Sequence, residues 1–171
     1  QVTTPDMLAV VTQTTLSVDD AAAILAAIKR RFPKVREPKQ QDICYATQNR
    51  QDAVKLMAPQ VDVVVVVGSP TSSNSNRLRE LAERLGTPAY MVDCPGDLQD
   101  AWFEGRPRVG LTAGASAPDV LVQQVIARLK AMGAVSVRRM QGVEEHVRFP
   151  LPKGLGGTGL DRPLPTERSQ A

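Results

Sequence analysis

The sequence holds few of the residues from which redox, metal and stacking sites are usually built. Its 171 residues include two cysteines, one histidine and one tryptophan, and aromatic residues make up 4% of the chain. Cys44 and Cys94 are too few for the disulfide framework of a small secreted domain. Together with His146 they cannot complete a four-ligand zinc site within one chain. A metal centre that uses Cys44 would therefore need ligands from elsewhere.

Long apolar runs and nucleic-acid motifs are also missing. No run approaches the ~18 residues of a membrane-spanning helix, and the start "QVTTPDML" lacks the basic and apolar regions of a signal peptide. The net charge of +3 and the pI of about 9.1 fit an ordinary solvated surface or attraction to an anion. No basic run is interleaved with aromatics. We therefore expect a cytoplasmic protein with neither a membrane nor a nucleic acid as partner.

Several catalytic and nucleotide-binding motifs do not occur. There is no G-x-x-x-x-G-K-[ST], and "VGSPTSSNSN" does not match the dinucleotide fingerprint. The segment "GASAP" lacks the last glycine of a nucleophile elbow. A serine triad would also depend on His146, close to the tail. A serine hydrolase is therefore the weakest of the functions considered.

Apolar segments along the chain alternate between strand-like and helix-like patterns. The pattern predicts strands at 7–12, 62–67, 89–93, 108–112 and 134–140, and helices at 18–31, 48–58, 76–85, 98–103 and 117–132. The strand at 62–67 is apolar without alternation, which is typical of a strand covered on both faces. The order predicts an α/β fold with parallel sheets flanked by helices. From Pro150 onward the chain is rich in proline and glycine and shows no core pattern.

Loops after three of the expected strands share one chemistry. They are "VTQTTLS" (11–17), "GSPTSSNSN" (68–76) and "LTAGASAPD" (111–119), and "CYATQN" (44–49) also opens a helix. A helix N-terminus presents unpaired N–H groups and a partial positive charge, which suit a phosphate. The carboxyl ends of parallel strands lie at one edge of a sheet, where such loops can converge. They predict a diphosphate site that needs no lysine.

Helix capping alone explains a serine or threonine at several of these positions. Ser17, Thr47 and Ser116 are each plausible N-caps, and capping is the favoured interpretation for any one of them. The run from Ser72 through Ser73 to Asn74 exceeds what capping requires, because one cap needs one residue. Ligand binding is favoured for that loop.

The two cysteines differ in their surroundings. Cys44 comes just before a helix start, where a thiolate is favoured and can bind a metal or an iron–sulfur cluster. A free cysteine is also commonly a small buried apolar residue. From spacing alone the two interpretations of Cys44 are equally good, whereas Cys94 is expected to be structural.

Four segments together resemble one family. "TQTTLSVDD", "DICYATQNRQDAV", "VVGSPTSSNSNRL" and "TAGASAPD" are similar, in the same order, to the C-terminal half of 4-hydroxy-3-methylbut-2-enyl diphosphate reductases, the LytB family. The resemblance covers most of 7–132. It implies a bacterial oxidoreductase of the non-mevalonate isoprenoid pathway. That enzyme removes the hydroxyl of an allylic diphosphate and yields isopentenyl and dimethylallyl diphosphates.

The resemblance also implies a site and its cofactor. The family holds an iron–sulfur cluster, 4Fe–4S or 3Fe–4S after loss of the unique iron, among three α/β lobes. Ferredoxin or flavodoxin commonly donates the electrons. By motif, Cys44 matches a cluster cysteine. The matches to substrate-binding residues are Thr14, Thr47, Ser72, Ser73, Asn74 and Ser116.

Other parts of the family pattern have no match. These are two further cluster cysteines, the histidines that clamp the diphosphate and the glutamate that delivers protons; His146 matches none of them. We therefore expect a C-terminal part of the reductase that holds no catalytic residue and is inactive alone. Residues 1–40 would belong to the middle lobe and 41–133 would form the complete third lobe. Residues 134–171 would be a C-terminal strand and an extended tail that packs on the missing first lobe.

An alternative function belongs to a different class. The chain would be a non-catalytic module that binds a phosphorylated metabolite, with Cys44 as a packing residue. It predicts diphosphate affinity that survives Cys44→Ser, and no iron.

Overall fold

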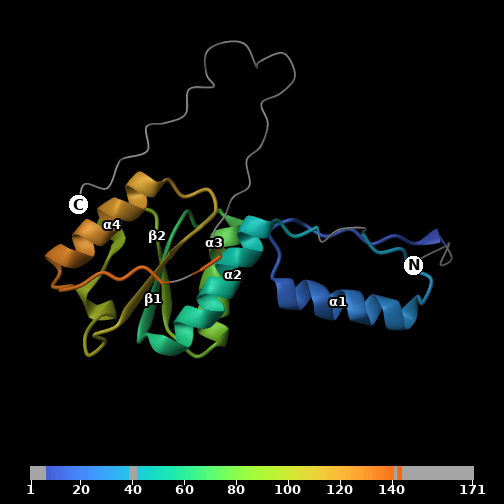
Figure 1. Cartoon of the computed structure of the whole chain (residues 1–171), viewed down its shortest axis with the longest axis horizontal. Coiled ribbons are helices and arrows are strands. Elements are labelled where there is room, and N and C mark those ends of the chain that lie inside the picture. The colour runs from blue at the N-terminus through green and yellow to red at the C-terminus, as the bar shows by residue number, and fades with distance from the viewer. Residues whose placement is uncertain (1–6, 39–41, 141, 144–171) are drawn as a thin grey trace, which may run out of the picture.

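A three-stranded parallel sheet forms the centre of the computed structural model, which describes residues 7–38, 42–140 and 142–143. The strands are β1 (Val63–Val67), β2 (Ala89–Val92) and β3 (Val109–Ala113), in the order β2–β1–β3. The α-helices are α1 (Val18–Arg31), α2 (Tyr45–Met57), α3 (Ser73–Arg84) and α4 (Asp119–Ala131). Helices α2, α3 and α4 flank the sheet, while α1 lies to one side (Figure 1). The predicted α/β fold with a parallel sheet is confirmed.

Strand β1 lies between its two neighbours and is the most deeply buried part of the chain. Its residue Val64 pairs with Ala89 of β2 on one side and with Gly110 of β3 on the other. All five valines of β1 have a relative exposure of 0%. Burial of one such side chain contributes ~1.5–3 kcal/mol. The strand is therefore a firm support for the loop that follows it.

Successive β1 side chains point to opposite faces of the sheet, and each face has its own core. One core joins the sheet to α2 and α3, and its buried members are Val54, Met57, Ala58, Val64, Val66, Leu78, Ala82 and Ala89. The other joins it to α4, and its buried members are Val65, Val67, Val92, Leu98 and Val125. Helices α3 and α4 therefore cover opposite faces.

Three short 3-10 helices complete the regular structure of the described residues. They are η2 (Ala58–Gln60), η3 (Pro95–Asp97) and η4 (Asp100–Trp102). The helix predicted at 98–103 is thus a single 3-10 turn. Trp102 in this turn stacks on Tyr90 of β2, with ring centroids 4.2 Å apart and planes 2° from parallel.

Two predicted strands are wrong. Residues 7–12 form one isolated parallel bridge, between Ala9 and Arg36, and Met7 and Val11 are 85% and 84% exposed. Residues 134–140 are irregular, and Val135 is 99% exposed. Both segments have apolar residues at strand-like spacing, but among the described residues neither finds a partner strand to complete a ladder. The tail beyond residue 143 and His146 lie outside the described residues.

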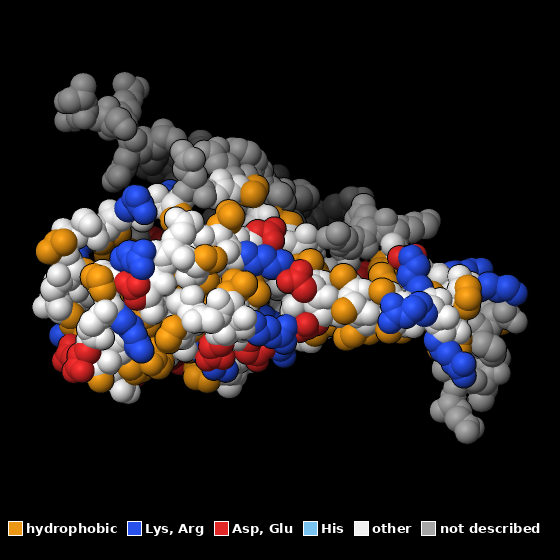
Figure 2. Space-filling view, turned by 90° about the horizontal axis from the view of Figure 1, so that it is seen from below, with side chains coloured by type: hydrophobic (Ala, Val, Ile, Leu, Met, Phe, Trp, Pro, Cys, Tyr) orange, Lys and Arg blue, Asp and Glu red, His pale blue; other side chains and the backbone are white. Residues whose placement is uncertain are grey.

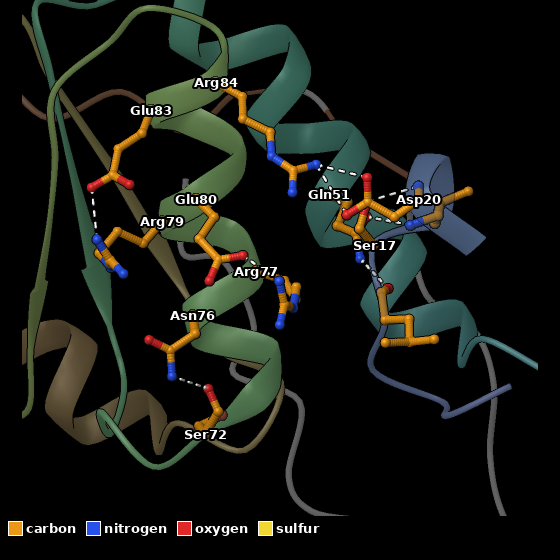
Figure 3. A network of polar contacts seen from close by, with 12 residues as sticks. Ser17, Asp20, Gln51, Ser72, Asn76, Arg77, Arg79, Glu80, Glu83 and Arg84 are labelled. Atoms are coloured by element: carbon orange, nitrogen blue, oxygen red, sulfur yellow. Dashed lines mark hydrogen bonds and ion pairs between the residues drawn. The ribbon is translucent and has the colours of Figure 1, made fainter. Parts of the chain in front are cut away.

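Helix α1 is attached to the rest of the chain mainly by its N-terminal end. The side chain of Gln51 in α2 accepts from Val18 N–H at 3.0 Å and donates to the Leu16 carbonyl at 2.9 Å. Arg84 of α3 pairs with Asp20 of α1 at 2.8 Å (Figure 3). The opposite end of α1 carries basic residues in its last turn, and Figure 2 shows Lys and Arg side chains gathered at that end of the molecule.

Candidate functional site

The candidate site lies at the carboxyl edge of the sheet, between the starts of α3 and α4. Strands β1 and β3 are neighbours, but the helices that follow them cover opposite faces. Such a divergence is where open α/β sheets usually bind ligands. Helix α2 also begins at this edge, because its C-terminal end leads through η2 into the start of β1. The three helix starts are therefore directed toward the same edge.

Ser72 is the N-cap of α3 and organises the loop before it. Its hydroxyl oxygen accepts from Ser75 N–H at 3.3 Å and from the Ser75 hydroxyl at 3.1 Å. The side-chain amide of Asn76 donates to the Pro70 carbonyl at 2.7 Å. It also donates to the Ser72 carbonyl at 3.0 Å (Figure 3). These bonds hold the loop against the first turn, so the helix begins at Ser73. The prediction of a start near Asn76 was three residues late.

Two glycines let the first turn of α3 approach the ends of β1 and β3. A Cβ added at Gly68 or at Gly114 would lie 2.2 Å from the Ser75 hydroxyl oxygen. No larger residue fits at either position unless Ser75 moves. Gly114 also donates its N–H to the Val67 carbonyl at 2.9 Å, which ties the loop after β3 to the end of β1.

Asn74, the second residue of α3, is the unusual member of the site. It is 5% exposed, yet neither its amide nitrogen nor its amide oxygen has a hydrogen-bond partner. The nitrogen lies 3.7 Å from the position that a Cβ on Gly114 would take, so the amide faces the loop between β3 and α4. A buried polar group without a partner costs about 1–3 kcal/mol. Asn74 is therefore ready to bond a group that comes from outside the chain.

Ser73 and Ser116 are the exposed residues of this part of the site. Ser73 is the first residue of α3. Ser116 lies in the loop before α4, whose N-cap is Pro118 and has no side-chain cap. The capping interpretation of Ser116 is therefore wrong. Both hydroxyls lie near a helix start and are open to a ligand.

The start of α2 brings Cys44, Thr14 and Thr47 together. Cys44 is the N-cap of α2, its side chain makes no capping bond, and it is exposed. Its N–H donates to the Thr14 carbonyl at 3.0 Å, and its carbonyl accepts from Thr47 N–H at 2.9 Å. The interpretation of Cys44 as a buried packing residue is therefore wrong.

The two threonines of this group differ in exposure. Thr14 is exposed, whereas Thr47 is 2% exposed and lies inside the first turn of α2. Thr47 is thus not an N-cap, which corrects that interpretation. Ser17, by contrast, does cap α1 and accepts from Asp20 N–H at 3.2 Å.

Two polar residues hold the Thr14 loop in place. Asp42 accepts from the N–H and the hydroxyl of Thr12 at 2.7 and 3.3 Å. Gln51, 2% exposed, bonds the backbone at the end of the loop. Neither residue was predicted as part of the site, because each bonds groups at least 30 residues away in the sequence.

A sequence model of the family described as LytB protein matches residues 1–130. The chain belongs to the LytB family. It is similar to curated proteins named 4-hydroxy-3-methylbut-2-enyl diphosphate reductase: one from Methylibium petroleiphilum at 80% identity over 161 residues, and one from Polaromonas sp. at 75% over 150 residues. The matches cover 94% and 88% of the LytB chain but 49% and 45% of those proteins. The chain thus spans about half the length of the curated relatives it matches.

Solved structures agree with this assignment. An E-1-hydroxy-2-methyl-but-2-enyl-4-diphosphate reductase from Plasmodium falciparum superposes with a TM-score of 0.81 at 34% identity, over 85% of the LytB chain and 46% of that chain. A second structure, of the terminal enzyme of the non-mevalonate pathway, gives 0.51 at 35% identity, over 72% of the LytB chain and 43% of that chain. The resemblance inferred from four sequence motifs is confirmed.

The described residues of the LytB chain do not by themselves fit an iron–sulfur cluster. Among residues 7–38, 42–140 and 142–143, no group of three or more His, Cys, Asp and Glu side chains lies close enough to hold a metal. Cys44 contributes one exposed thiol, which makes no capping bond. A cluster would need further ligands beyond those side chains.

Cys94 lies in a different setting. It is exposed and is the N-cap of η3, where the carboxylate of Asp97 accepts from the N–H groups of Asp93 and Cys94 at 2.8 and 3.0 Å. These bonds lower the pKa of Asp97, with the largest contribution from the Cys94 N–H. The contacts fit the structural role that was expected for Cys94.

Within the described part of the chain, no helix has both the length and the apolar character needed to cross a membrane.

Proposed function

We propose that the LytB chain provides the diphosphate-binding side of a 4-hydroxy-3-methylbut-2-enyl diphosphate reductase. On this proposal Ser72, Ser73, Asn74 and Ser116 bind the diphosphate, and Thr14 and Thr47 line the same cavity. The substrate would be the allylic diphosphate of the non-mevalonate isoprenoid pathway. The division into a middle-lobe part at 1–40, a third lobe at 41–133 and a C-terminal segment at 134–171 stays a prediction.

The single observation that carries the proposal is the buried and unpartnered amide of Asn74. Its nitrogen is a donor that can bond a phosphate oxygen. It lies beside the first N–H groups of α3, where the helix dipole also favours an anion. A bond to a charged group contributes more than one between neutral groups, ~1.5–3 kcal/mol. Bound diphosphate would thus offset the cost of burying the amide.

We propose further that Cys44 supplies one thiolate to an iron–sulfur cluster whose other ligands come from beyond the described side chains. The exposed Sγ at the start of α2, which makes no capping bond, supports this role because it is open to a ligand. Because the sequence has two cysteines, we expect neither a stable cluster nor reductase turnover from the chain alone. A cytoplasmic location and electron delivery by ferredoxin or flavodoxin are parts of the same proposal.

Binding of inorganic diphosphate, measured by titration calorimetry, tests the Asn74 assignment. Asn74→Ala should lower the affinity about 10- to 100-fold, because one bond to a charged group is lost. Its free energy of unfolding should not fall, since removal of an unsatisfied buried amide offsets the lost packing. A variant that binds diphosphate as well as the parent chain would contradict the assignment.

Gln60→Ala is the matched control for removal of the Asn74 side-chain amide in the diphosphate titration. Gln60 is exposed, and its amide donates to the Leu56 carbonyl at 2.7 Å, at the opposite edge of the sheet. Its removal should leave diphosphate affinity unchanged. A similar loss in both variants would indicate a general effect on the fold.

The cluster assignment needs a separate test. The chain is coexpressed with the part of the Methylibium petroleiphilum relative that it does not match, and the complex is reconstituted anaerobically with iron and sulfide. Bound iron and the visible absorbance of a cluster should appear with the parent chain and be lost with Cys44→Ser. A stable cluster and turnover in the chain alone would refute its expected inactivity. Diphosphate binding without iron in any combination would favour the non-catalytic module.

A further inference from the structure

Ser75 lies directly behind the N-cap of α3 and is part of no contact assigned above to the ligand. It is 1% exposed and occupies the third position of the helix. Both its N–H and its hydroxyl donate to the hydroxyl oxygen of Ser72, at 3.3 and 3.1 Å. A capping bond requires the N–H alone. The second bond is therefore additional to what the helix needs.

The additional bond decides what the Ser72 hydroxyl can still do. A serine hydroxyl has one donor proton and two acceptor lone pairs. Ser75 fills both acceptor positions of Ser72, and because the Ser75 hydroxyl is the donor in this pair, it does not receive the Ser72 proton. The Ser72 hydroxyl can therefore still donate one hydrogen bond, through an O–H that points away from Ser75.

We propose that Ser75 is a positioning residue that fixes Ser72 as a hydrogen-bond donor toward the diphosphate. The inference rests on the proposed function, since it concerns the same site. A hydroxyl that is free to rotate can present either its proton or a lone pair. A lone pair directed at a phosphate oxygen is repelled, whereas the O–H is attracted. Because Ser75 occupies both lone pairs of the Ser72 hydroxyl, Ser72 can present only its proton to the ligand, which suits an anion.

The two glycines explain why a serine is suited to this position. The Ser75 hydroxyl oxygen lies 2.2 Å from the place that a Cβ would occupy on Gly68 and also on Gly114. The hydroxyl therefore lies in space that both strand ends leave free. Threonine would add a methyl group to this confined space, and alanine would fit but lose the bond to Ser72.

A double-mutant cycle on the full chain tests the inference, with inorganic diphosphate as the ligand and calorimetry as the readout. Ser75→Ala should lower affinity about 3- to 10-fold, the range for loss of one oriented neutral bond. Ser72→Ala should lower it at least as much. Adding Ser75→Ala to Ser72→Ala should then cause no further loss, because Ser75 acts through Ser72. A purely structural role of Ser75 would lower affinity by the same factor in both backgrounds.

Ser69→Ala is the control within the same loop. The Ser69 hydroxyl bonds Thr71 at 2.9 Å rather than Ser72, so this variant should bind diphosphate like the parent chain. Thermal unfolding of every variant establishes that the chains compared are folded. Parent-like affinity of Ser75→Ala, or additive losses in the cycle, would overturn the positioning role while leaving the proposed function intact.

The outcomes for the two proposals are separable. If the parent chain does not bind diphosphate, the proposed function is refuted. The claim that Ser72 donates to diphosphate then fails as well. The donor assignment has its own readout in the NMR signal of the Ser75 hydroxyl proton. We expect this proton to exchange slowly and to show an Overhauser contact with the Ser72 Cβ protons. Rapid exchange and no contact would overturn the assignment, whether or not diphosphate binds.

Discussion

Helices α3 and α4 begin after neighbouring strands of one sheet, yet their first turns are built differently. The start of α3 has a side-chain cap at Ser72, two buried polar residues in Asn74 and Ser75, and glycines below it. The start of α4 follows Pro118, has no side-chain cap, and has the exposed Ser116 in front of it. Both present N–H groups to the same edge. Of these two helix starts, only that of α3 has buried polar groups beyond those that capping requires.

This difference shows how a ligand site can be told from an ordinary helix start. Every helix N-terminus has unpaired N–H groups and a positive dipole end. Those groups do not by themselves require a ligand, because water can satisfy exposed N–H groups at a helix start. The amide of Asn74 differs, because it is buried and neither of its polar atoms has a hydrogen-bond partner, so a bond from a ligand would satisfy it. We therefore expect α3 to dominate binding and α4 to assist.

The largest expected effect concerns the glycines below α3. Gly68→Ala and Gly114→Ala should each lower the free energy of unfolding by about 1–3 kcal/mol, as overpacking usually does. The new Cβ would lie 2.2 Å from the Ser75 hydroxyl oxygen in both variants. Urea unfolding measures the loss. Gly96→Ala is the control, since its Cβ would meet the Cys94 sulfur at 3.6 Å, an ordinary contact.

Removal of the Ser75 hydroxyl should change the stability effects of Gly68→Ala and Gly114→Ala by different amounts. The Ser75 Cβ would lie 3.5 Å from a Cβ on Gly114 but 2.9 Å from one on Gly68. In a Ser75→Ala background, Gly114→Ala should therefore become nearly neutral, and Gly68→Ala should remain destabilising. Equal rescue of both variants, or of neither, would contradict this account of the packing at α3.

A smaller effect is expected at the start of α4. Ser116→Ala should lower diphosphate affinity about 2- to 10-fold, less than Asn74→Ala, because the exposed Ser116 hydroxyl exchanges a bond to water for its bond to the ligand. Its unfolding free energy should stay the same, because Ser116 is exposed and does not cap the helix. Calorimetry and urea unfolding of the same sample measure both quantities. An affinity loss larger than that of Asn74→Ala would reverse the ranking of α3 and α4.

The smallest effect concerns the far end of α3, where Arg84 contacts α1. The hydrogen bond from Arg84 outweighs the opposing effect of desolvation and lowers the pKa of Asp20. The pair therefore stabilises the fold above the usual Asp pKa of about 4, and this contribution is lost as the pH falls through the lowered value. Arg84→Ala should be slightly less stable than the parent chain at pH 7 and equally stable in strong acid. Added salt should shrink the difference, because the pair is exposed.

Several helices, strands and polar loops could be predicted from the sequence, because each depends on a local residue pattern. The apolar stripe and the Ser17 cap predicted α1 with its observed bounds, and the run of valines predicted a strand buried on both faces. The polar run from Ser72 to Asn74 was predicted to do more than cap the helix, and its role in ligand binding stays a prediction. Each of these features depends on neighbours close in the sequence.

Features that depend on distant neighbours were missed or misplaced. The first turn of α3 has no apolar residue, so periodicity placed its start at Asn76. Residues 134–140 carry strand-like spacing, but a strand also needs a partner, which local sequence does not reveal. The contact of Ser75 with Gly68 and Gly114 is invisible until β1 and β3 are placed side by side.

The central claim is that diphosphate binds at the start of α3, and backbone NMR during a titration with inorganic diphosphate tests it most directly. The largest shift changes should occur at the N–H groups of 72–75 and the side-chain amide of Asn74, with smaller ones at 114–116. The basic turn of α1, with Lys29, Arg30 and Arg31, is the competing anion site on charge alone. Changes confined to that turn, with the amides of α3 unmoved, would contradict the account.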